Sequence, residues 1–85
     1  MIFSVRRSGV RNARRYVVAA LDRGLTILQT LATDKTPLSL HEIVARAHIP
    51  KTTTFRLLVT LERRGFVART RDRAYRIGRS ARRLT

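Results

Sequence analysis

The side chains in this sequence that are best suited to chemistry are cations and hydroxyls gathered at a helix start. Lys51, Thr52 and Thr53 follow a proline, and Arg56 comes one helical turn later. A lysine beside the amide-rich end of a helix attracts phosphate, while threonine and arginine donate hydrogen bonds to phosphates or base edges. The spacing predicts nucleic-acid binding by these four residues.

The third threonine, Thr54, is expected to differ from its neighbours. Its spacing to Leu57 and Leu58 places it on the buried side of the helix. A simpler interpretation of all three threonines also stays open, namely that they only begin a surface helix.

A second basic group lies in the stretch "RTRDRAYR", where we predict Arg71, Arg73 and Arg76 to bind DNA. Arginines at the tip of a hairpin suit a minor groove, whose negative potential attracts guanidinium groups. Regular alternation would place Arg69, Arg71 and Arg73 on one side of the hairpin. The alternative is an edge strand that its charge protects from aggregation.

The remaining polar residues do not suggest an enzyme, and we predict no catalytic, cofactor or metal site. The five acids are scattered, and no Ser–His–Asp arrangement is suggested. His41 and His48 are seven residues apart, whereas a zinc pair on a helix usually has four-residue spacing. The absence of cysteine excludes disulfides and thiolate sites. His48 instead suits a corner between helices, where a positive φ is often needed.

The composition favours a polyanionic partner. The 85 residues include 19 Lys and Arg against five acids, a net charge of +14, and fit one small domain. Nucleic acid is the first choice of partner and an acidic membrane surface the second. No apolar run approaches the ~18 residues of a membrane span, so no membrane insertion is expected. The first 20 residues also resemble a transit peptide, but the rest of the chain is just as basic.

These residues need a scaffold of helices, which the apolar periodicity supplies. A helical pattern runs from about Tyr16 to Thr33, with Leu21, Leu25, Leu28 and Leu31 on one face. Gly24 within it suggests close packing against another backbone. "TDKTP" then breaks the helix.

A capping box of Ser39 and Glu42 begins a short second helix, which Pro50 ends. A third helix is predicted from about Lys51 to a left-handed cap at Gly65. "FVART" and "AYRIG" then read as a hairpin joined by "RDR".

This order predicts a mainly α fold with a small β-hairpin, a winged helix-turn-helix of three helices plus a two-stranded wing. We expect a basic, mobile arm over residues 1–15, the domain over 16–78, and the start of a linker over 79–85. The arm either follows phosphates or has no role, and both interpretations stay open.

Three stretches together strongly resemble the N-terminal DNA-binding domain of the IclR family of bacterial transcription regulators. They are "ALDRGLTILQTLA", "PLSLHEIVARAHIPKTTTFRLLVTLERRGFV" and "YRIG", within residues 19–78. The resemblance implies a cytoplasmic homodimer that binds double-stranded operator DNA and uses the first helix in dimerisation. It places Lys51, Thr52, Thr53 and Arg56 where the recognition helix meets DNA. We add Ser39, at the start of the preceding helix, to the predicted DNA-binding residues.

The sequence departs from the family pattern at His48, where the family usually has glycine, and at the turn "RDR", which lacks the common Asp-Gly. Family members also carry a large C-terminal domain that binds a small effector. We therefore expect a small-molecule effector only if such a domain exists outside this chain, which is either a fragment or a short protein.

Two rival functions remain at this point. One is a basic winged-helix module associated with RNA or the ribosome, although few exposed aromatics are expected for stacking on single strands. The other is a dimerisation module whose charge is incidental. Competition between duplex DNA and structured RNA distinguishes the first alternative from DNA binding. Apolar self-association without salt-sensitive binding to a polyanion would identify the second.

Overall fold

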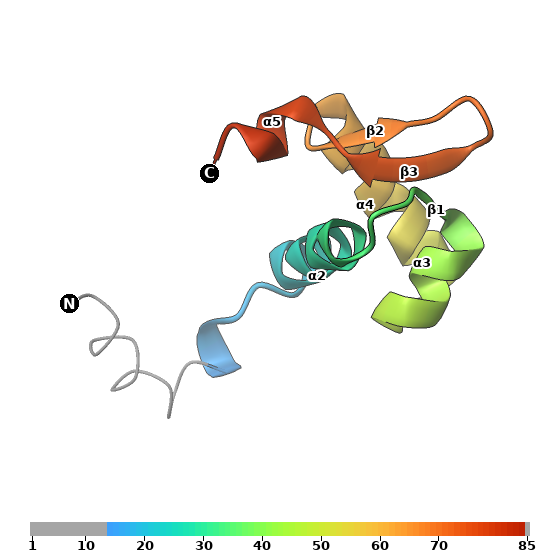
Figure 1. Cartoon of the computed structure of the whole chain (residues 1–85). Coiled ribbons are helices and arrows are strands. Elements are labelled where there is room, and N and C mark those ends of the chain that lie inside the picture. The colour runs from blue at the N-terminus through green and yellow to red at the C-terminus, as the bar shows by residue number, and fades with distance from the viewer. Residues whose placement is uncertain (1–13, 85) are drawn as a thin grey trace.

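The computed structural model describes residues 14–84, which form three main helices and a small antiparallel sheet (Figure 1). The predicted arm over residues 1–15, apart from its last two residues, lies outside this part of the chain. The elements are η1 (Arg14–Tyr16), α2 (Ala19–Thr33), β1 (Leu38–Ser39), α3 (Leu40–Ala47), α4 (Lys51–Arg63), β2 (Val67–Arg69), β3 (Ala74–Ile77) and α5 (Arg79–Arg82). The mainly helical winged fold predicted from the sequence is confirmed.

Helix α2 packs on the rest of the domain through only part of the stripe that was expected. Ile27 and Leu31 are buried in the core, whereas Leu21 and Leu25 are 63% and 50% exposed. The helical period places these leucines on one face, but it does not decide which part of that face other elements cover. The helix also begins at Ala19 rather than near Tyr16.

The prediction for Gly24 was wrong. A side chain at this position would meet no atom of another element within 4 Å, so no backbone approaches it closely. The missing side chain instead contributes to an apolar hollow of about 250 Å³ between α2 and α4. The hollow is lined by Ala20, Leu21, Gly24, Leu25, Leu28, Leu57, Thr60 and Leu61.

The start of α3 is fixed by the predicted capping box. The Glu42 backbone N–H donates to the Ser39 hydroxyl oxygen at 3.1 Å, and Ser39 N–H donates to Glu42 Oε1 at 2.8 Å. Together these bonds satisfy two amides that a helix start leaves without partners. The backbone bond from Ser39 is the main cause that lowers the pKa of Glu42.

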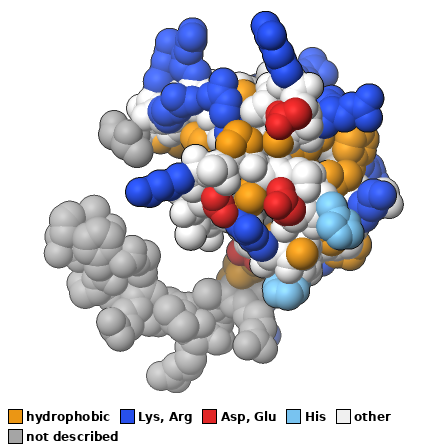
Figure 2. All heavy atoms as spheres, turned by 45° about the vertical axis from the view of Figure 1, so that its right-hand side comes forward, with side chains coloured by type: hydrophobic (Ala, Val, Ile, Leu, Met, Phe, Trp, Pro, Cys, Tyr) orange, Lys and Arg blue, Asp and Glu red, His pale blue; other side chains and the backbone are white. Residues whose placement is uncertain are grey.

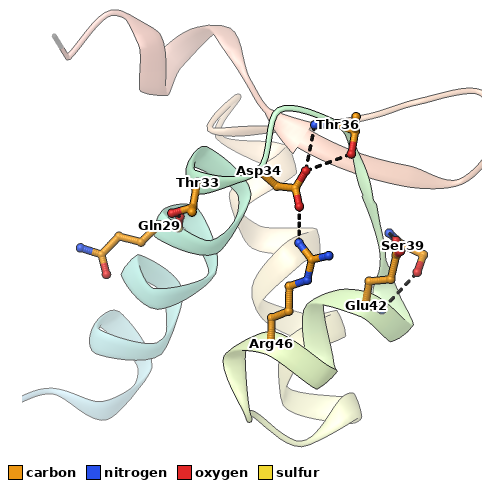
Figure 3. A network of polar contacts seen from close by, with 7 residues as sticks. All are labelled: Gln29, Thr33, Asp34, Thr36, Ser39, Glu42 and Arg46. Carbon is orange, nitrogen blue, oxygen red and sulfur yellow. Dashed lines mark hydrogen bonds and ion pairs between the residues drawn. The ribbon is translucent and has the colours of Figure 1, made fainter.

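A second polar contact joins the turn after α2 to α3, as Figure 3 shows. The Arg46 guanidinium pairs with the Asp34 carboxylate, which also accepts hydrogen bonds from the Thr36 backbone N–H and hydroxyl. Chiefly because of the Arg46 bond, the pKa of Asp34 falls from its ordinary 3.8 to about 2. The contact holds the turn that leads into β1.

The sheet has three strands rather than the two of the predicted wing. Strand β3 lies in the centre, antiparallel to both β1 and β2. Leu38 of β1 pairs with Tyr75, and Val67 of β2 pairs with Ile77. The short strand before α3 therefore joins the hairpin to the helices.

One core holds the helices and the sheet together. Its buried side chains come from all three main helices, from the strands and from the corner before α4: Ile27, Leu31, Leu38, Ile43, Ile49, Leu58, Val67 and Tyr75. Gly65, at φ 80°, ends α4 in the left-handed conformation that was predicted. A side chain on Gly78 would lie 2.3 Å from the Gly65 carbonyl oxygen, so glycine is needed where the hairpin meets this cap.

Candidate nucleic-acid interface

The corner between α3 and α4 sets the direction of α4. His48 adopts the left-handed conformation, with φ 58° and ψ 40°, and its N–H donates to the Val44 carbonyl at 3.0 Å. The positive φ predicted for this residue is confirmed. Ile49 then enters the core, and Pro50 precedes the first residue of α4.

The three threonines of α4 have three different environments. Thr54 is fully buried, and its hydroxyl donates to the Ile49 carbonyl at 3.1 Å, so the expected inward position is confirmed. Thr52 is exposed, as predicted. Thr53 is only half-exposed, because helical spacing places it beside the half-buried Leu57.

The outward side of α4 is polar and basic at its start. Lys51, Thr52 and Arg56 are all exposed, and the first turn of the helix contains no acid. The amide groups of that turn add positive potential. The structure thus groups three of the predicted binding residues on one accessible surface, with Thr53 at its margin.

Ser39 has a structural role as the residue that caps the start of α3. Its hydroxyl oxygen accepts the Glu42 N–H, and the residue is half-exposed. The bond uses the oxygen as an acceptor, so donation of the hydroxyl hydrogen to a phosphate stays chemically open. Its predicted contact with DNA remains a prediction.

The hairpin turn presents two of the three predicted arginines. The Arg73 N–H donates to the Thr70 carbonyl at 3.2 Å, and the Thr70 hydroxyl bonds Asp72, which closes a tight turn. Arg71 and Arg73 are exposed at this turn, and Arg73 has a left-handed φ of 65°. The side-by-side order expected from regular alternation therefore does not extend through the turn.

Arg76 lies apart from that turn. It pairs with Ala68 in the body of the hairpin and lines a hollow at its base with Arg79 and Arg82. Arg69 is on the opposite face of the strand pair, with its guanidinium 5.6 Å from the centre of the Tyr75 ring. The structure therefore does not bring Arg76 together with Arg71 and Arg73.

The hairpin and α5 carry a dense group of cations. Figure 2 shows lysine and arginine side chains gathered along the top of the molecule, where Figure 1 places the hairpin and α5. Few acidic side chains lie among them in this view. Such a surface attracts a phosphate backbone over a broad area.

Sequence reasoning missed three exposed residues on the outward side of α4. Phe55, Val59 and Arg63 are exposed, although the first two are apolar. They follow Thr52 at spacings of three, seven and eleven residues, which continue one helical face. Projecting the helix from Thr52 finds all three.

Residues 14–84 show neither a membrane-spanning helix nor a cluster of metal-ligating side chains. No helix in this range is long and apolar enough to cross a membrane. The same range contains no group of three or more His, Cys, Asp or Glu residues arranged to hold a metal ion.

A capped short helix, a tight corner, a following helix with an exposed basic start and a basic hairpin define a winged helix-turn-helix domain. The IclR helix-turn-helix domain matches residues 20–71, more than half of the chain. The chain therefore belongs to the IclR family of DNA-binding transcription regulators.

Curated relatives agree with this assignment. The chain is 40% identical over 50 residues to the "Transcriptional repressor IclR" of Escherichia coli (strain K12), covering 59% of this chain and 18% of the relative. The same values hold for the "Acetate operon repressor" of Salmonella typhimurium (strain LT2). The chain thus spans about a fifth of the length of these relatives.

Solved structures show the same fold. An IclR-family regulator from Brucella abortus superposes with a TM-score of 0.76 at 32% identity, over 89% of this chain and 30% of that one. Pseudomonas aeruginosa HmgR gives a TM-score of 0.74 at 28% identity, over 79% of this chain and 28% of that one.

Proposed function

We propose that this chain binds double-stranded DNA in a sequence-specific manner and catalyses no reaction on it. We propose that it is the DNA-binding part of a bacterial, cytoplasmic transcription regulator. In this arrangement α4 lies in a major groove and the hairpin turn lies against a neighbouring minor groove. The observation that carries it is the division of α4. Lys51, Thr52 and Arg56 are exposed on one side, while Thr54 and Leu58 are fully buried on the other.

Phosphate contacts should supply most of the affinity, and they make it depend on salt. With about six to eight phosphate contacts, log K should fall against log salt with a slope of roughly −5 to −7. The exposed arginines of the hairpin turn, Arg71 and Arg73, contribute to that slope. Replacing both by alanine should flatten it, and an unchanged slope would show that the turn does not touch the backbone.

Arg56 is the residue best placed to read a base. It lies one turn beyond Thr52, and a guanidinium can bond the O6 and N7 atoms of guanine together. Arg56→Ala should cost about 1–3 kcal/mol on the preferred sequence and much less on unrelated duplexes. Arg64→Ala, which removes the same charge from the other end of α4, is the matched control.

The experiment begins with selection of a preferred duplex from a randomised pool, followed by affinities at one fixed salt concentration. An equal loss on all sequences for Arg56→Ala would demote the residue to a phosphate anchor. Structured RNA is the competitor in a parallel assay. If RNA displaces the preferred duplex at equal concentration, the result would favour an RNA-binding module over the proposed DNA-binding function.

The same proposal includes a homodimer formed through α2. Leu21 and Leu25 are exposed beside the hollow at Gly24, and Tyr16, Val17 and Val18 extend the apolar surface. An apolar face of this kind is typical of an interface between protein chains. The two recognition helices should then meet half-sites about 34 Å apart, or a multiple of this.

Leu25→Glu should abolish self-association, measured by sedimentation, because it places a charge in the apolar face. Leu84→Glu changes an exposed leucine outside that face and is the control. Equal dimerisation of wild type and Leu25→Glu would contradict the α2 interface. A small-molecule effector enters the proposal only through a domain outside these 85 residues.

A further inference from the structure

The outward side of α4 carries an apolar pair that the polar contacts of the proposed function leave unexplained. Phe55 is 46% exposed and Val59 is 48% exposed. A single exposed apolar residue is common on protein surfaces, but these two lie one turn apart on the same face. They therefore form a small continuous surface rather than two unrelated exposures.

The pair is distinct from the apolar surface proposed for dimerisation. That hollow touches α4 through Leu57, Thr60 and Leu61. At about 100° per residue, Phe55 and Val59 point roughly a quarter turn or more away from these three positions. A second chain seated on α2 would leave the pair accessible.

The neighbours of the pair are mostly cationic and polar, and the one acid among them, Glu62, lies three residues beyond Val59 toward the end of α4. Arg56 adjoins Phe55, Thr52 lies one turn before it, and Arg63 lies one turn after Val59. A protein partner for an apolar patch does not require this positive surround, whereas a DNA groove does. The charge thus favours duplex DNA as the occupant.

The major groove contains an apolar group that such side chains can recognise. Thymine presents its C5-methyl group there, and phenylalanine and other apolar side chains contact it. We propose that Phe55 and Val59 recognise thymine methyl groups in the major groove and are specificity-determining residues. This inference rests on the proposed insertion of α4 into that groove.

The helix geometry limits where these thymines lie. Four residues along α4 correspond to about 6 Å, and successive base pairs are spaced by about 3.4 Å. The two methyl groups should therefore lie within about two base-pair steps of each other. Because Arg56 adjoins Phe55, the guanine that Arg56 contacts should lie within the same short stretch.

The test uses the preferred duplex and replaces each thymine in a half-site by uracil, one at a time. Uracil keeps the Watson–Crick pair and removes only the methyl group. Wild-type protein should lose about fourfold in affinity at each of two positions, the effect of exposing one methyl-sized group. The Phe55→Ala variant should bind thymine and uracil equally at one of them, and Val59→Ala, which removes both γ-methyl groups, should do so at the other.

Leu84→Ala is the control, because it truncates an exposed leucine away from α4 and should keep the wild-type response to uracil. A wild type that tolerates uracil everywhere would overturn the inference, as would an undiminished uracil penalty in both variants. Failure to select any duplex would instead refute the proposed function, and the inference with it. Variants that bind DNA like wild type would reassign the pair to a protein partner.

Discussion

Replacing Arg73 by glycine should change the stability of the fold and its affinity for DNA in opposite directions. Arg73 has a φ of 65° at the end of the hairpin turn. A left-handed conformation costs a residue with a side chain about 1–2 kcal/mol, and the extra freedom of glycine in the unfolded chain costs about 0.5–1 kcal/mol. The difference predicts that Arg73→Gly raises the free energy of unfolding by about 0.5–1 kcal/mol.

The same substitution removes one cation from the proposed wing contact. One lost phosphate contact reduces the salt slope by about 0.9. When salt is raised from 50 to 200 mM, the fall in affinity should therefore be roughly three- to fourfold smaller for the variant than for wild type. Urea denaturation measures the first effect, and fluorescence anisotropy with a labelled duplex measures the second.

Arg71→Gly is the matched control, since it makes the same chemical change at a neighbouring residue without a positive φ. It should lower stability by about 0.5–1 kcal/mol. If Arg73→Gly destabilises the domain as much as the control, the reasoning from backbone strain is wrong. If its salt slope equals that of wild type, Arg73 does not contact a phosphate.

Two further predictions concern the scaffold of the proposed interface. Thr54→Val removes the buried hydroxyl that bonds the Ile49 carbonyl, and it should lower the free energy of unfolding by about 1 kcal/mol. Thr52→Val, the control at an exposed position, should change the free energy of unfolding by less than about 0.5 kcal/mol in the same urea titration. The pKa of Asp34 is about 2 in the folded state, below its ordinary 3.8, so its contribution is present above about pH 4 and lost as the pH falls toward 2. The urea midpoints of wild type and Asp34→Asn should therefore differ at neutral pH and converge near pH 2, and a constant difference would contradict this assignment.

The elements nearest the proposed interface were predictable because their signals are local. The Ser39–Glu42 capping box, the corner at His48 and the left-handed cap at Gly65 each depend on a few adjacent residues. The inward position of Thr54 follows from its spacing to Leu58 alone. The residue types at these positions therefore determine the backbone almost without tertiary context.

Features that depend on distant partners were not predictable in the same way. Strand β1 has two residues, too few to show alternation, and it forms only by pairing with β3 much later in the chain. Leu21 and Leu25 belong to the same helical stripe as the buried Leu31, so their exposure depends on where α4 lies. Phe55 was missed because an apolar residue within a helix is usually assigned to the core.

The most direct test of the account is a titration of isotope-labelled protein with its preferred duplex, following backbone amide resonances. We predict the largest changes along α4 from Lys51 to Val59 and in the turn from Thr70 to Arg73. An unrelated duplex should produce smaller changes at α4 under the same salt conditions. Changes confined to α2 or α5, with the amides of α4 unaffected, would contradict the claim that α4 reads DNA.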